Sequence, residues 1–158
     1  MNPYLLPALL MTPDLIRRAF SRLPRDLWDA RKDPERFTPR EVVCHLCDWE
    51  PILLERLKAG VETPGVQVPY FDEGQRAVDL RYSEWDPFEA LERWKQAREQ
   101  TVAFIKTLSK EDFHKTFVHP KRGETTIYDA ITMMPCHDIY HLEQITSYLP
   151  EEKVADVW

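Results

Sequence analysis

Residues 38–58 read TPREVVCHLCDWEPILLERLK and predict one long amphipathic helix. Thr38 can cap the first turn, Pro39 suits the first helical position, and Glu41 completes a capping box. Apolar side chains then recur every three or four residues, at Val42, Leu46, Trp49, Leu53 and Leu57. A helix with a single apolar stripe must pack against other elements, so this stretch favours a helical bundle.

Three further helix starts follow the same logic, with a capping residue before proline or an acid in the first turn. They lie at Thr12-Pro13, Asp86-Pro87, and Thr126 with Asp129. Apolar residues recur with helical periodicity after each start, which predicts helices over residues 13–23, 87–108 and 126–149. Residues 4–10 can add a separate turn or two. We therefore predict an all-α fold, a four-helix bundle in which residues 1–158 form a single domain.

Residues 60–85 form a connection that is long for a compact helical domain. Residues 72–78 can form a short helix within it. The alternation from Val66 to Tyr70 is strand-like, but Pro64 and Pro69 interrupt it, so we expect a loop there. A connection of this length permits a crossover, so the helices need not run alternately up and down.

The composition is that of a globular protein, because 43% of the 158 residues are hydrophobic and can form a core. Acidic side chains outnumber basic ones by 27 to 21, which gives a net charge of −6. No basic stripe is visible, which argues against a nucleic-acid partner and against an anionic membrane surface. No apolar run reaches the roughly 18 residues of a membrane-spanning helix. Three cysteines form an odd count, so we expect a cytoplasmic protein with reduced thiols.

Two histidines lie one helical turn apart in the last predicted helix. His137 and His141 differ by about 40° around the helix axis, so both rings lie on its inward face. Two imidazoles at this spacing can share a metal ion, although core or surface histidines also occur four residues apart. His45 lies at the edge of the apolar stripe of residues 38–58, and three inward histidines would be costly to bury without a partner. The pattern predicts one divalent metal ion held inside the bundle by His45, His137 and His141.

A rival ligand set combines Cys44 and Cys47 with His137 and His141, as in structural zinc sites. Helix geometry turns both cysteines away from the apolar stripe, and most of the chain separates the two halves, which disfavours this set. We interpret Cys136 as a packing residue.

The other polar residues near these histidines allow two interpretations. Asp48 and Asp138 adjoin the predicted ligands, and each could orient an imidazole or form a salt bridge on a helix face. The same ambiguity applies to Arg98 and Glu143. Of the remaining histidines, His114 is expected in solvent. His119 begins a turn before the last helix and could lie near the mouth of the metal site, but we favour a surface turn.

These motifs, in this order, resemble the DinB/YfiT-like superfamily of four-helix metalloproteins. The resemblance rests on HLCDWE at residues 45–50 and HDIYHLEQI at residues 137–145, with Asp86-Pro87, Arg98 and residues 119–126 between them. It implies a bundle with a crossover connection, a homodimer, and a nickel, zinc, iron or manganese ion on His45, His137 and His141. It also implies a hydrolase, or a transferase that acts with a low-molecular-weight thiol.

Three neutral nitrogen ligands leave a coordination position open, at which an ion can lower the pKa of water or activate a thiolate. We therefore expect a metal-dependent enzyme acting on a small molecule, either a small-thiol-dependent transferase or a hydrolase, with residues 60–85 beside its pocket. Two alternatives remain open. One is a non-catalytic metal-binding bundle acting in stress response or assembly, and the other is a protein–protein module without metal.

Overall fold

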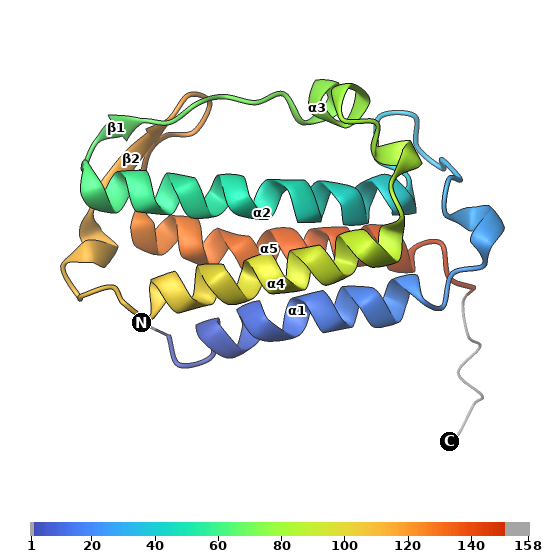
Figure 1. Ribbon diagram of the computed structural model, residues 1–158, viewed down its shortest axis with the longest axis horizontal. Helices are drawn as coiled ribbons and strands as arrows, with labels where there is room; N and C mark the ends of the chain where they lie inside the picture. Colours follow the sequence, from blue (N-terminus) through green and yellow to red (C-terminus); the bar gives the residue numbers. More distant parts are fainter. Residues whose placement is uncertain (1, 151–158) are drawn as a thin grey trace, which may run out of the picture.

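The computed structural model describes residues 2–150 and consists mainly of four long helices packed side by side (Figure 1). They are α1 (Leu5–Phe20), α2 (Pro39–Glu62), α4 (Pro87–Ile105) and α5 (Ile127–Thr146). Helices α1 and α2 each pack against both α4 and α5, so α1 and α2 occupy opposite corners of the bundle. Figure 1 shows α1 and α5 running in one direction and α2 and α4 in the other. The predicted four-helix bundle is confirmed.

The chain runs back along the whole bundle between α2 and α4 (Figure 1). It forms the short strand β1 (Val66–Gln67), then the helix α3 (Glu73–Asp79) and a 3-10 turn, η2 (Tyr82–Glu84). The Asp72 carboxylate caps α3 by accepting a hydrogen bond of 2.9 Å from the backbone N–H of Gln75. This return confirms the predicted crossover, and it lets α2 and α4 pack in parallel.

A small sheet at one end of the bundle was not predicted. Strand β1 pairs in parallel with β2 (Thr116–His119), and β2 pairs antiparallel with β3 (Gly123–Thr126). The expected loop was wrong because only Val66 and Gln67 pair, and neither interrupting proline lies within that pair. Strand β3 leads directly into α5, so the sheet fixes how the chain enters that helix.

The predicted start at Thr12-Pro13 was also wrong, because α1 runs unbroken from Leu5 through Pro13. A proline inside a helix leaves the carbonyl four residues earlier without its usual donor. Here that carbonyl belongs to Leu9, and it accepts a hydrogen bond of 3.1 Å from Arg98 Nη1. The Thr12 side chain is buried in the bundle instead of capping a helix.

The core consists of two apolar clusters. One contains Phe20 and Trp94, and the other contains Leu57 and Ile131. Four buried polar residues, one near the middle of each long helix, belong to neither cluster: Thr12, Glu50, Arg98 and Asp138. We call these four residues the polar layer.

The capping box of α2 is present, as predicted: the N–H of Glu41 donates to Thr38 Oγ1 at 3.2 Å, and the N–H of Thr38 donates to the Glu41 carboxylate at 2.9 Å. Thr38→Ala removes the first bond, so we expect the free energy of unfolding to fall by about 1 kcal/mol. Urea denaturation measures the loss. Thr38→Ser keeps the hydroxyl and serves as the control; an equal loss in both variants would contradict the capping role.

No helix within residues 2–150 combines the length and apolar character needed to cross a membrane.

Candidate metal centre

Three imidazole rings from two helices meet inside the bundle. His45 lies on α2, and His137 and His141 lie one turn apart on α5. The Nε2 atom of His137 is 3.3 Å from Nε2 of His45 and 3.1 Å from Nε2 of His141. The three ligand nitrogens all lie within 4.8 Å of one another.

The spacing of these nitrogens fits a metal ion. Two nitrogens bound at about 2.0–2.1 Å in a tetrahedral arrangement are about 3.4 Å apart. The observed separations of 3.1 and 3.3 Å are close to that value. In addition, no carboxylate or thiol of the described residues joins the three histidines. The set can therefore offer three neutral nitrogens and leave the ion's remaining coordination open.

A hydrogen bond at Nδ1 of His141 determines that its other ring nitrogen, Nε2, faces the centre. Nε2 of the Gln144 amide donates a hydrogen bond of 2.7 Å to the carbonyl of Phe37. The Oε1 atom of the same amide therefore faces His141 Nδ1, 3.2 Å away. An amide oxygen only accepts, so Nδ1 carries the proton and Nε2 is left free to bind a metal. His45 differs, because its buried Nδ1 has no hydrogen-bond partner among the described residues.

Burial keeps the three rings neutral. It is the main cause that lowers the pKa of His137 to about 4 and that of His141 to about 3. The pKa of His45 is also well below its usual value, first because of burial and then because of the two other histidines. A metal binds the neutral imidazole, so the rings are ready for an ion at neutral pH without losing protons.

These pKa shifts predict an acid-sensitive fold in the metal-free protein. Each folded pKa lies below the unfolded value of about 6.5, so the unfolded chain binds more protons as the pH falls below 6.5. Stability should therefore fall from pH 6.5 towards pH 4, by up to about 1.4 kcal/mol per pH unit for each histidine. Urea midpoints of chelator-treated protein at pH 7, 6 and 5 measure this. His137→Ala should flatten the profile, whereas removal of the exposed His114 should not; identical profiles for the two variants would contradict the assignment.

Neither Asp48 nor Asp138 orients an imidazole. The Asp48 carboxylate accepts hydrogen bonds from Arg76 and from the Tyr82 hydroxyl. Asp138 forms an ion pair with Arg98 at 2.7 Å in the buried polar layer. Of the two other ambiguous residues, Glu143 makes a surface pair with Arg36 at 3.5 Å. The acids beside the candidate ligands are therefore structural.

All three cysteines lie differently from their predicted positions. Cys44 and Cys47 are buried in one apolar cluster although they lie off the predicted apolar stripe. The crossover connection reaches Cys44, whose Sγ lies 3.5 Å from the Tyr82 carbonyl. Burial raises the pKa of Cys44 to about 12, which keeps it a thiol. Both lie outside the histidine cluster, so the structure gives the rival zinc set no support. Cys136 is exposed on a cavity wall instead of packing in the core.

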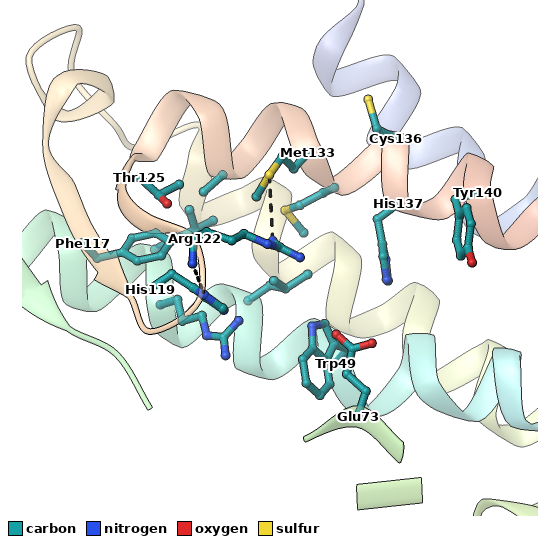
Figure 2. A pocket seen from close by; sticks show the side chains of 15 residues that line it. Trp49, Glu73, Phe117, His119, Arg122, Thr125, Met133, Cys136, His137 and Tyr140 are labelled. Atoms are coloured by element: carbon teal, nitrogen blue, oxygen red, sulfur yellow. Dashed lines mark hydrogen bonds between the residues drawn. The ribbon is translucent and has the colours of Figure 1, made fainter. Parts of the chain in front are cut away.

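A cavity of about 320 Å³ opens beside the histidine cluster (Figure 2). Of the three clustered histidines, only His137 lines it. Its wall is largely apolar, with contributions from Trp49, Leu53, Leu57, Phe117, Ala130, Met133 and Met134. The polar groups on the wall come from Arg56, Glu73, His119, Arg122, Thr125, Cys136, His137 and Tyr140. A small molecule in this cavity would reach the centre at His137.

The expectation of a surface turn at His119 was wrong. His119 ends strand β2, is only 9% exposed and lines the cavity, whereas His114 is exposed as predicted. The backbone N–H groups of Lys121 and Arg122 donate to His119 Nδ1 at 3.2 and 3.3 Å, so the proton of the neutral ring lies on Nε2. The sequence signal was the alternation of Phe117 and His119, which turns both side chains to the same face of a strand.

Comparison with known proteins agrees with this architecture. The model of the DinB superfamily matches residues 8–145, so the chain belongs to that family. A protein of Oceanobacillus iheyensis named "Putative metal-dependent hydrolase" is 26% identical over 136 residues, 85% of this chain and 78% of its own. A protein of Bacillus cereus with the same name is 29% identical over 138 residues, with 79% and 78% covered.

Two solved structures show the same fold. YfiT from Bacillus subtilis, described as a probable metal-dependent hydrolase with an unusual four-helix bundle topology, superposes with a TM-score of 0.86 at 21% identity, covering 91% of this chain and 83% of YfiT. The mycothiol-dependent maleylpyruvate isomerase superposes with a TM-score of 0.71 at 10% identity, covering 89% of this chain and 59% of the isomerase. At these identities, the likeness concerns the fold alone.

Proposed function

We propose that this chain is a metal-dependent hydrolase in which His45, His137 and His141 hold one divalent ion. The observation that supports this most is the convergence of three neutral imidazoles, with Nε2 atoms 3.1 and 3.3 Å apart, beside a cavity that can hold a small molecule. The relatives named as metal-dependent hydrolases support the same class of reaction.

The bound ion would supply Lewis acidity at the end of the cavity and lower the pKa of a water molecule there. The protein fixes the position of the ion and provides a largely apolar cavity wall beside it. His45 is fully buried and His141 is 5% exposed, so solvent reaches the centre through the side that His137 forms. The apolar wall would hold the substrate's body against that side and exclude competing water.

Glu73 is the one carboxylate among the described residues that line the cavity. It lies in the first turn of α3. Figure 2 shows it beside Trp49 and below His137. A carboxylate in this place can accept the proton of an attacking water, so Glu73→Gln should lower kcat about 100-fold. It should leave the metal content unchanged. Glu84→Gln, on the same connection but outside the cavity wall, is the control; full activity of Glu73→Gln would remove Glu73 from the reaction.

Elemental analysis of natively purified protein tests the metal centre, with one ion per chain as the expected result. The second step compares metal-loaded and chelator-treated protein on a panel of small esters, amides and phosphoesters, with and without a low-molecular-weight thiol. Hydrolysis that depends on the ion alone supports the proposal. Protein that binds no ion, or turnover that requires the thiol, would overturn it.

A further inference from the structure

Arg56 is a buried arginine that forms no ion pair with any described residue. It lies on α2, eleven residues or about three helical turns after His45, and therefore on the same side of the helix. The residue is 6% exposed, and no carboxylate of the described residues lies within 4.0 Å of its guanidinium. By contrast, Arg98, the other arginine buried to this degree, pairs with two carboxylates.

The guanidinium of Arg56 is held in place, but its buried Nε donor is unused. Nη2 donates to the carbonyl of Pro69 at 3.0 Å, and the group lies over the Trp49 ring, 5.7 Å from its centroid. Its Nε atom is buried and has no hydrogen-bond partner within residues 2–150. A buried cation with an unused N–H is costly unless an anion binds to it. An anion bound beside Arg56 would offset this cost.

A second cation faces the same cavity. Arg122, in the turn between β2 and β3, also lines the wall, and its Nη1 atom lies 3.9 Å from Met133 Sδ (Figure 2). Arg56 and Arg122 therefore line the same cavity. Burial and then repulsion from Arg122 lower the pKa of Arg56, whereas attraction from Glu73 raises it. His119 adds its Nε2–H, which no described residue accepts.

The acids that line this cavity and the adjoining one form no ion pair with Arg56 or Arg122. Glu73 is on the wall and attracts Arg56 from beyond ion-pair distance. Asp72 borders an adjoining cavity of about 280 Å³, where it caps α3 and accepts a bond from the Tyr70 hydroxyl. That adjoining cavity also contains Arg56 and Arg122 and adds Lys121. The linings of the two cavities therefore combine three basic residues with two acidic ones, in a chain of net charge −6.

We propose that Arg56 and Arg122 bind a carboxylate of the substrate, whose apolar body lies on the wall between them and His137. The proposal rests on the proposed hydrolase function and specifies its substrate as a molecule with an apolar body and a free carboxylate. A guanidinium provides the planar pair of donors that a carboxylate accepts, and the apolar wall selects for a hydrophobic body.

Calorimetric titration with 3-phenylpropanoate and its neutral amide tests the proposal. Chelator-treated protein is used first, because a carboxylate could otherwise bind the ion itself. The acid should bind at least about tenfold more tightly than the amide, as expected for a hydrogen bond to a charged group. Equal affinities, or no binding of either at millimolar concentration, would overturn the proposal.

Arginine variants assign the effect to its residues. Arg56→Gln and Arg122→Gln should each reduce the preference for the acid several-fold or more, and Arg56→Lys should retain part of it. Arg18→Gln, an equal change of charge on α1 outside this cavity, should retain all of it. If Arg56→Gln does not fold, the exposed Arg122→Gln carries the test, and an unchanged preference in it counts against the proposal.

The same titration separates this proposal from the hydrolase proposal. Acid binding by chelator-treated protein, together with a lack of bound metal in elemental analysis, would keep the carboxylate site and remove the hydrolase. Metal-dependent hydrolysis with no preference for the acid would keep the hydrolase and remove the carboxylate site.

Discussion

His137→Ala is expected to abolish stoichiometric metal binding. The Nε2 atom of His137 lies between those of His45 and His141, at 3.3 and 3.1 Å, so its loss leaves two imidazoles without the central ligand. Loss of an outer partner of a ligand typically costs about 10- to 100-fold in affinity, and loss of the ligand itself should cost more. Competition with a chromophoric chelator measures the affinity. Gln144→Ala removes the hydrogen-bond partner of His141, so its metal affinity should fall by only about 10- to 100-fold.

The same variant should lose the stability that the ion confers. A ligand that binds only the folded state stabilises it by about 2.7 kcal/mol at a concentration 100-fold above its Kd. Adding the ion should therefore raise the Tm of the chelator-treated wild type and leave that of His137→Ala unchanged. His114→Ala is the matched control, because His114 is exposed and lies outside the cluster. A full Tm rise in His137→Ala would contradict the assigned centre.

The sequence predicted helix starts well where the capping residue acts locally. Asp86 caps α4 through the N–H groups of Phe88 and Glu89, and Thr126 caps α5 through that of Asp129, as expected. At Thr12 the same local signal failed, because the decisive contact is non-local. The Leu9 carbonyl accepts from Arg98 on another helix, and this contact lets α1 continue through proline. Short-range patterns do not reveal such a contact.

The meeting of three imidazoles could be predicted because helix spacing places two of them together and bundle packing brings the third near. The cavity could not be predicted in the same way. His119 and Arg122 reach it from a hairpin whose strands are four residues long, and Glu73 reaches it from the crossover connection. Arg56 did carry a signal, its spacing of eleven residues from His45. The absence of an ion-pair partner among the described residues, which makes Arg56 informative, is visible only in three dimensions.

Arg98 connects all four long helices from the polar layer. Arg98 lies on α4 and donates two hydrogen bonds of 2.8 Å to Glu50 on α2. It donates two more, of 2.7 and 3.2 Å, to Asp138 on α5, and one to the Leu9 carbonyl on α1. The Thr12 hydroxyl also contacts Asp138. The Arg98 side chain is 2% exposed and each of the two acid side chains is 1% exposed, so water cannot replace a lost partner.

Arg98→Met should lower the free energy of unfolding by about 3–5 kcal/mol, because two buried carboxylates lose their counter-charge and the Leu9 carbonyl loses its donor. Urea denaturation of chelator-treated protein measures this independently of the metal. The triple variant Glu50→Leu, Arg98→Met, Asp138→Leu removes the charges together and should be less destabilised than Arg98→Met alone, because burying an unpaired charge costs more than replacing the whole group by apolar side chains. If the triple variant is the less stable of the two, the buried ion pairs themselves, and not the penalty for unpairing them, stabilise the bundle.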